Sequence, residues 1–186
     1  MSFTNSLEGQ LLVAAPSLHS PPFQHTVILL MEHTAEGALG VVLNRPIKET
    51  ISQLWEKVGA EAPRSERLVH FGGPVSGPLL ALHLSPKLGE KRVPPGLYLA
   101  AARHHLERLV RQDKIPFRLF VGHAGWGGGQ LENELSQGVW MTLPARPEHV
   151  FSEDQNLWKS VIEQIGWSVL TAAGNVKHRP ADLRWN

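Results

Sequence analysis

The chain has 186 residues and a nearly balanced charge, with 18 basic and 17 acidic side chains. Residues 1–100 carry 8 of each sign, and residues 101–186 carry 10 basic and 9 acidic ones. The sequence therefore lacks the basic half or patch typical of nucleic-acid-binding proteins, and we expect no specific DNA binding. The absence of cysteine excludes a disulfide, a thiolate nucleophile and cysteine-ligated zinc.

The length is that of a single domain, which we place at residues 1–174. Residues 175–186 have no apolar period and are expected to form a loose tail whose removal leaves the fold intact. The first ten residues lack the charged and apolar regions of a signal peptide, and no apolar run approaches the ~18 residues of a membrane span. We therefore expect a cytoplasmic protein without a membrane partner.

The first half of the chain alternates strands and turns around one helix. Apolar strands are predicted at Gln10–Ala15, at Thr26–Met31 and at residues 38–44, the last two forming a hairpin. The helix Thr50–Val58 has four apolar residues at helical spacing, a capping box of Thr50 with Gln53, and Gly59 as its stop signal. Further strands are predicted at Val69–Phe71, Leu79–Leu84 and Leu97–Ala100, and residues 85–96 are expected to form a loop.

Two more helices are predicted in the second half. The amphipathic segment Arg103–Asp113 buries Leu106, Leu109 and Val110. After a strand at Val139–Leu143, a capping box of Ser152 with Gln155 predicts a helix that ends at Gly166. Strands and helices mix without a strict βαβ alternation, which favours the α+β class.

The most informative stretch runs from Phe120 to Trp140, FVGHAGWGGGQLENELSQGVW. A strand at Leu119–Val121 leads into a glycine-rich turn, and the leucines of QLENEL indicate a following helix. Such a turn directs free backbone N–H groups at one point and could bind an anion, but the spacing matches neither standard phosphate-binding motif. A tight structural turn explains the same glycines. Trp126 lies between glycines and is expected to wall a pocket rather than join the core.

Other candidate groups each have a structural explanation. Glu32 and His33 could act together, but neighbouring strand residues point to opposite faces. Arg45 could bind a carboxylate or phosphate, or be merely exposed. Ser76 lacks the first glycine of a nucleophile elbow. The ten histidines show no zinc-ligand spacing, so we predict no metal site and no cofactor. The basic residues on the helix from Arg103 are best explained as a solvated face.

Four segments together resemble the AlgH/YqgE family of bacterial proteins. They are GQLLVAAPSL (9–18), VILLMEH with EGALGVVLNRP (27–46), FGGPVSGPLLALH (71–83) and GHAGWGGGQLENEL with Trp140 (122–140). The resemblance covers roughly residues 6–172. It implies an α+β fold with a bifurcated, largely antiparallel sheet folded into a pseudo-barrel with flanking helices. Many members are labelled transcriptional regulators, without a settled activity.

This chain departs from the family pattern in three places. Met31 stands where many members have cysteine, so thiol chemistry at that position cannot operate here. His123 replaces the usual tyrosine, and Lys177–Asn186 replaces a short Gly-His-Ala ending. The first departure weakens an enzymatic interpretation.

Two functional hypotheses follow, beside a third, direct transcriptional control, which predicts strongly salt-dependent DNA affinity. The first is a non-enzymatic regulatory or binding protein, whose unknown ligand or protein partner meets a common rim formed by the turns at residues 44–46, 72–74 and 125–132. The second is an enzyme or binding protein for a small anionic metabolite at the glycine-rich turn, with Arg45 as clamp and His123 or Glu132 as base. The sequence assigns no residue a catalytic role with enough support to name it. The predicted binding residues are Asn44, Arg45, Gly72, Gly73, His123, Gly125, Trp126, Gln130 and Glu132. A pocket joining these residues would favour the second hypothesis, and an apolar patch the first.

Overall fold

A computed structural model describes residues 6–61, 63–152 and 154–172. The predicted tail at 175–186 and its proposed removal lie outside the described residues. None of the helices in the described ranges is long and apolar enough to cross a membrane. Within these ranges the elements, in chain order, are β1 (Gln10–Ala14), β2 (Val27–Thr34), β3 (Gly37–Val42), β4 (Pro46–Thr50), α1 (Ile51–Lys57), β5 (Leu68–Phe71), β6 (Leu80–His83), β7 (Lys91–Val93), β8 (Leu97–Ala100), α2 (Arg103–Val110), β9 (Phe117–Val121), β10 (Ala124–Gly127), α3 (Gln130–Ser136), β11 (Trp140–Pro144), α4 (Pro147–Phe151) and α5 (Asp154–Ala172).

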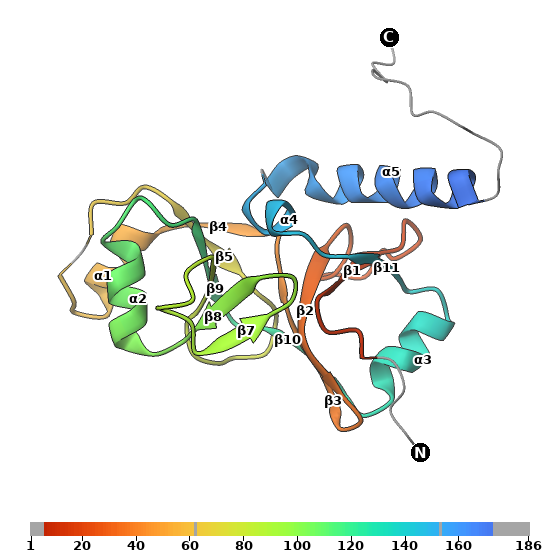
Figure 1. The fold of residues 1–186 in the computed structure, drawn as a ribbon, viewed down its shortest axis with the longest axis horizontal. Helices are drawn as coiled ribbons and strands as arrows, with labels where there is room; N and C mark the ends of the chain where they lie inside the picture. Colours follow the sequence, from red (N-terminus) through yellow and green to blue (C-terminus); the bar gives the residue numbers. More distant parts are fainter. Residues whose placement is uncertain (1–5, 62, 153, 173–186) are drawn as a thin grey trace, which may run out of the picture.

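The strands form two sheets (Figure 1). The first has the order β10-β3-β2-β1-β11 and is antiparallel throughout. The second has the order β4-β5-β9-β6-β8-β7, in which β5 and β9 are parallel. The α+β class and the bifurcated, largely antiparallel sheet are confirmed. The pseudo-barrel consists of two open sheets, since neither closes on itself within the described residues.

The two sheets meet where the chain passes from β3 to β4 and from β9 to β10. At this junction the Val42 N–H donates to the Gly72 carbonyl at 2.8 Å, and the Gly72 N–H donates to the Val121 carbonyl at 2.8 Å. The Phe71 N–H donates to the Arg45 carbonyl, also at 2.8 Å. Three segments that are distant in sequence are thus joined by backbone hydrogen bonds at the fork of the sheet.

Apolar residues form three core clusters. One is formed by residues of both sheets together with α4 and α5, and includes Leu157 and Val161 of α5 with Leu11 and Val13 of β1. A second joins α1 and α2 to the second sheet, and includes Trp55 and Leu106. The third lies under α3, on the opposite side of the first sheet from α5 (Figure 1), and contains both Trp126 and Trp140.

The helices α1 and α2 confirm the two helices predicted from apolar residues at helical spacing. Thr50 caps α1 with the predicted capping box, and Gly59 follows with a φ of +69°. The three apolar residues predicted to be buried on α2 are buried. The capping residues and the apolar stripes therefore determine these helices locally.

Four local predictions are wrong. The loop at 85–96 contains β7, an edge strand paired with β8, and the glycine turn contains β10, an edge strand paired with β3. Sheet pairing supplies the hydrogen bonds that a single-sequence pattern does not show. The helix α5 continues through Gly166 to Ala172, because an interior glycine costs only about 1 kcal/mol and does not end a helix by itself. Ser152 is the C-cap of α4.

Candidate functional site

The structure divides the nine predicted binding residues into two groups. Five of them lie at the sheet junction and are called the junction group here: Asn44, Arg45, Gly72, Gly73 and His123. The other four belong to β10 and α3: Gly125, Trp126, Gln130 and Glu132. Strand β10 runs antiparallel to β3 with Gly127 opposite Gly37, so α3 begins at the far end of β3 from the junction. The expected common rim is not formed.

The polar side chains of the junction group bind the neighbouring backbone. Asn44 is 7% exposed; its Oδ1 accepts the Val27 N–H at 3.0 Å, and its Nδ2 donates to the His25 carbonyl at 2.9 Å. The Arg45 guanidinium donates through Nη2 to the Gln24 carbonyl. These two side chains therefore fix the turn that precedes β2.

The glycines of the junction group allow two backbone segments to approach closely. A Cβ on Gly72 would lie 2.3 Å from the Gly122 carbonyl oxygen, and a Cβ on Gly73 would lie 2.2 Å from the His123 carbonyl carbon. Gly73 also has a φ of +152°, which disfavours any other residue. By contrast, a Cβ on Gly125 would meet only ordinary contact, with Val75 at 3.8 Å. Close packing at the fork accounts for Gly72 and Gly73.

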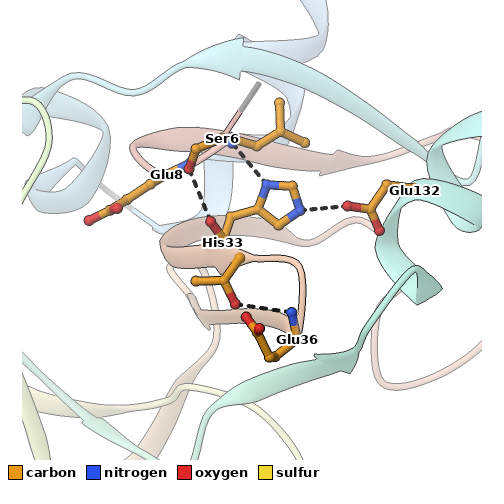
Figure 2. A network of polar contacts seen from close by, with 7 residues as sticks. Ser6, Glu8, His33, Glu36 and Glu132 are labelled. Carbon is orange, nitrogen blue, oxygen red and sulfur yellow. Dashed lines mark hydrogen bonds and ion pairs between the residues drawn. The ribbon is translucent and has the colours of Figure 1, made fainter. Parts of the chain in front are cut away.

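A buried histidine connects α3 with the N-terminal segment (Figure 2). The His33 Nε2 lies 2.9 Å from Oε1 of Glu132, and Nδ1 accepts the Leu7 N–H at 2.9 Å. Because Nδ1 accepts a hydrogen bond, Nε2 carries the proton that is donated to Glu132. The Ser6 hydroxyl donates to the His33 carbonyl at 3.2 Å. The His33 side chain is 3% exposed and that of Glu132 is 44% exposed.

This arrangement is suited to holding segments together. A histidine that acts as a general base needs one ring nitrogen within reach of the substrate. Here one nitrogen binds the backbone before β1 and the other binds α3. The sequence-based expectation that Glu32 and His33 diverge is confirmed, since Glu32 pairs with Lys91 at 3.0 Å while His33 points to the other face. The His33–Glu132 pair connects β2, α3 and the N-terminal segment.

A second carboxylate on α3 binds two buried indoles. Oε2 of Glu134 accepts from Trp126 Nε1 at 2.9 Å and from Trp140 Nε1 at 2.7 Å. Its Oε1 accepts from Gln130 Nε2 at 3.0 Å, and Gln130 Oε1 accepts the Gly127 N–H at 3.1 Å. Trp126 is 7% exposed and lies edge-on to Trp140, so its expected role as a pocket wall outside the core is wrong. The contacts of His33, Glu132, Gln130 and Glu134 together are called the α3 network below.

Sequence reasoning missed His33 and Glu134 as members of this network. Buried indole N–H groups require acceptors, and QLENEL places carboxylates close to two tryptophans in the chain. That requirement is the signal that could have identified Glu134. The pairing of His33 with Glu132 spans 99 positions and depends on the sheet register, which the sequence does not show.

The surroundings of the α3 network are acidic. Figure 2 shows the Glu132 carboxylate facing His33, with Glu36 nearby and Glu8 directed away from the ring. The Thr34 hydroxyl and the backbone N–H of Glu36 hold the pKa of the exposed Glu36 carboxyl below its ordinary value. Several carboxylates at one end of the hairpin disfavour an anionic ligand there. Among the described residues, no group of three or more candidate side chains is placed to hold a metal ion.

The larger cavities lie elsewhere. The α1–α2 groove, of about 360 Å³, is lined by residues of both helices and by Val58, Leu79, Ala101 and Val121. The α4–α5 cavity, of about 710 Å³, lies between these helices and β11. Two further hollows, of about 600 and 300 Å³, are shallow and charged. None of these four cavities is lined by a predicted binding residue.

Known proteins share sequence similarity with nearly the whole of this chain. The family model described as AlgH-like matches residues 11–170. A "UPF0301 protein" of Cupriavidus metallidurans is 34% identical over 181 residues, covering 93% of this chain and 95% of the relative. A "UPF0301 protein" of Streptomyces avermitilis is 37% identical, covering 88% and 89%.

Solved structures show the same architecture. The solution structure of the AlgH protein from Pseudomonas aeruginosa matches with a TM-score of 0.75 at 26% identity, covering 96% of this chain and 99% of that protein. A crystal structure of a protein from Corynebacterium diphtheriae matches in fold, with a TM-score of 0.70 at 24% identity, covering 88% and 90%. With the family model covering most of the chain and relatives matching nearly end to end, the chain belongs to the AlgH-like family.

Proposed function

We propose that this protein is a non-enzymatic binding protein whose α1–α2 groove receives an amphipathic helix of a partner protein. The observation that carries the proposal is the composition of the groove. It is lined by Leu54 and Trp55 of α1, Leu106 of α2, and the apolar residues around them, with Arg103 and Glu107 as the charged members. An open hollow with an apolar lining is the usual form of a protein-binding surface.

Exposed aliphatic side chains extend the groove at both ends. Val58, directly after α1, is 62% exposed, and Val121, at the end of β9, is 41% exposed. Val75 is 43% exposed and pairs with His123 across an isolated bridge. Val121 lines the groove and is followed directly by Gly122 and His123, so the groove lies two residues along the chain from the junction group. Covering this surface would remove apolar area from water, at roughly 25 cal/mol per Å².

The shape and the rim favour a helical occupant. Figure 1 shows α1 and α2 side by side at one end of the molecule, on the second sheet. A groove between two helices accepts the apolar face of a third, which places residues at i, i+3, i+4 and i+7 into it. Arg103 and Glu107 form an ion pair of 2.8 Å at the edge, which offers both charges to the polar face of the partner. The volume of about 360 Å³ suits a few anchoring side chains.

Under this proposal, any regulatory role acts through a protein partner rather than through DNA. Several described cations are paired with carboxylates, including Lys91 with Glu32, Arg103 with Glu107 and Arg111 with Glu61. Paired charges leave little net field to attract a phosphate backbone. We expect no mobility shift of DNA that survives competitor DNA at physiological salt.

Site-specific photo-crosslinking in the native host tests the proposal. A photoreactive residue is placed at position 58 in the groove or, as a control, at Leu84, which directly follows β6 and is 38% exposed. We expect one cross-linked protein at position 58, absent at position 84 and lost when Val121→Asp is added. The proposal fails if position 58 gives no product, if both positions give the same product, or if Val121→Asp leaves the product unchanged while the variant stays folded.

A further inference from the structure

A second hollow, the α4–α5 cavity, lies on the side of the molecule that carries α5 (Figure 1). Its volume is about 710 Å³, well inside the range of roughly 300–1,000 Å³ typical of small-molecule sites. Its wall combines three elements, with Leu143 from β11, Arg146 and Glu148 at the start of α4, and one face of α5. It shares no lining residue with the α1–α2 groove.

The part of α5 that lines this cavity carries a polar row, in which Asn156 and Ser160 are exposed and Gln164 is half-buried. Asn156, Ser160 and Gln164 follow one another at four-residue spacing, which places them in one row. Leu157 and Val161, one position further along, are buried in the core. The helix is thus anchored by one row, while the adjacent row carries two amides and a hydroxyl at the hollow, with Gln164 Nε2 donating to the Ser160 hydroxyl oxygen at 3.4 Å. Such groups fix the orientation of a polar ligand.

A buried histidine forms part of the cavity wall. His149 is 7% exposed, and its Nδ1 accepts the Arg146 N–H at 3.0 Å. Burial lowers the pKa of His149; the Gln164 side chain and Glu148 oppose this shift, and the Arg146 charge adds to it. The His149 ring is therefore uncharged at neutral pH, and the charged side chains that line the cavity are Arg146 and Glu148.

These two charges are of opposite sign and both are exposed. Among the described residues, neither side chain takes part in an ion pair with another residue. An arginine binds a carboxylate with two parallel hydrogen bonds, and a carboxylate binds an ammonium group. A hollow whose lining offers one of each, together with Leu143, Leu157 and two amides, is complementary to a small zwitterion.

We propose that the α4–α5 cavity binds a free α-amino acid. Arg146 receives the ligand carboxylate, Glu148 receives its ammonium group, and the ligand side chain lies against Leu143 and Leu157. The amides of Asn156 and Gln164 and the Ser160 hydroxyl contact the polar atoms that remain. This binding is independent of the groove between α1 and α2.

Calorimetric titration of the full chain with each of the twenty standard amino acids tests the proposal. We expect saturable binding of at least one, with binding to the matching carboxylic acid that lacks the amine at least ten-fold weaker. Arg146→Ala and Glu148→Gln should each weaken binding at least ten-fold. Arg108→Ala, which removes an exposed arginine from α2, should leave the affinity within two-fold. Ser160→Leu should narrow the hollow, remove the hydroxyl and weaken binding without changing either charge.

Three outcomes overturn the proposal. One is the absence of heat with all twenty amino acids. Another is equal affinity for an amino acid and its deaminated counterpart, which would indicate an anion site instead. The third is retention of affinity in Arg146→Ala and Ser160→Leu, with both variants melting like the parent, which would place the binding elsewhere. None of these readings depends on a partner at the groove.

Discussion

The α3 network and the α1–α2 groove lie at opposite ends of the molecule and have opposite chemistry (Figure 1). In the network, Glu134 and His33 bind other parts of the same chain. In the groove, Leu54, Val58 and Val121 face an open hollow. The side chains of α3 that suggested a binding site in the sequence therefore contact other parts of the same chain, and the surface that we propose for a partner is apolar. Substitutions in the network should cost stability, and substitutions in the groove should cost binding.

The largest effect is expected at the junction between the two regions. Gly73→Ala would force a Cβ to within 2.2 Å of the His123 carbonyl carbon at a φ of +152°. Backbone strain and overpacking, at roughly 1–3 kcal/mol each, should lower the free energy of unfolding by about 2–6 kcal/mol. Urea denaturation measures the change. Gly125→Ala is the matched control, because its Cβ meets only ordinary contact; an equal loss in both variants would contradict the steric explanation.

The next largest effect on stability is expected in the α3 network, and it should exceed the effect of a substitution in the α1–α2 groove. Glu134→Ala removes the acceptor of both indole N–H groups, Trp126 Nε1 and Trp140 Nε1. An unsatisfied buried donor costs roughly 1–3 kcal/mol. Since Glu134 is partly exposed and water can reach part of the gap, we expect a loss of about 2–4 kcal/mol in urea denaturation. Val121→Asp in the groove should change stability by less than about 0.5 kcal/mol, and the reverse order of the two variants would overturn the comparison.

These expectations show what the sequence could and could not predict. Local signals were sufficient for α1, where Thr50, Gln53 and Gly59 mark both ends, and for the hairpin of β2 and β3. The strands β7 and β10 were missed because their hydrogen bonds come from neighbouring strands rather than from their own residues. The prediction that Gly166 ends α5 is wrong, because one interior glycine costs only about 1 kcal/mol and the helix continues to Ala172.

The site was harder to predict than the fold. The sequence identified residue types that could bind a ligand, but not which of them already had a partner. Asn44 and Arg45 are occupied by backbone carbonyls near residue 25, and Glu132 by a histidine 99 positions away. The sequence pattern did not predict the apolar groove, because Val58 and Val121 have the sequence context of an ordinary helix end and an ordinary strand end. Whether a polar group already has a hydrogen-bond partner depends on three-dimensional packing, which the sequence pattern does not show.

Acid should weaken the sheet that carries the groove. His83 of β6 is fully buried; burial lowers its pKa, the nearby His105 of α2 lowers it further, and the Leu88 backbone and Glu90 oppose the shift. The unfolded chain therefore takes up protons first as the pH falls below about 6.5. The free energy of unfolding is therefore unchanged by His83 above about pH 6.5. It falls as the pH drops from there to the lowered pKa of His83 in the folded protein. For one histidine the slope is at most about 1.4 kcal/mol per pH unit.

Urea denaturation between pH 7.5 and pH 5 measures this dependence. His83→Asn should flatten it, because the asparagine oxygen can still accept the Ser85 N–H that Nδ1 accepts at 3.1 Å. His104→Asn, at an exposed position of α2, is the control and should leave the slope unchanged. His149, whose pKa is also lowered by burial, contributes with the same sign, so the flattening is partial. A slope that is identical in His83→Asn and the parent would assign the effect to other groups.

The smallest effect decides whether Glu132 is a binding residue. The Glu132 side chain is 44% exposed and accepts a hydrogen bond from His33 Nε2 at 2.9 Å. In Glu132→Gln the amide oxygen can accept the same bond, and the charge near the first turn of α3 is lost. A carboxylate at a helix start contributes about 0.3–1 kcal/mol, so the cost should be a few tenths of a kcal/mol.

Gln130→Ala serves as the companion, because it removes the contacts to the Gly127 N–H and to Glu134 without changing the charge. Melting temperature and binding to the cross-linked partner are measured together for both variants. If the α3 network is only structural, both variants bind like the parent and melt slightly lower, Gln130→Ala more so. Lost binding at an unchanged melting temperature in Glu132→Gln would instead extend the binding surface from the groove to α3, since an exposed carboxylate with a satisfied hydrogen bond has no other way to affect a distant partner.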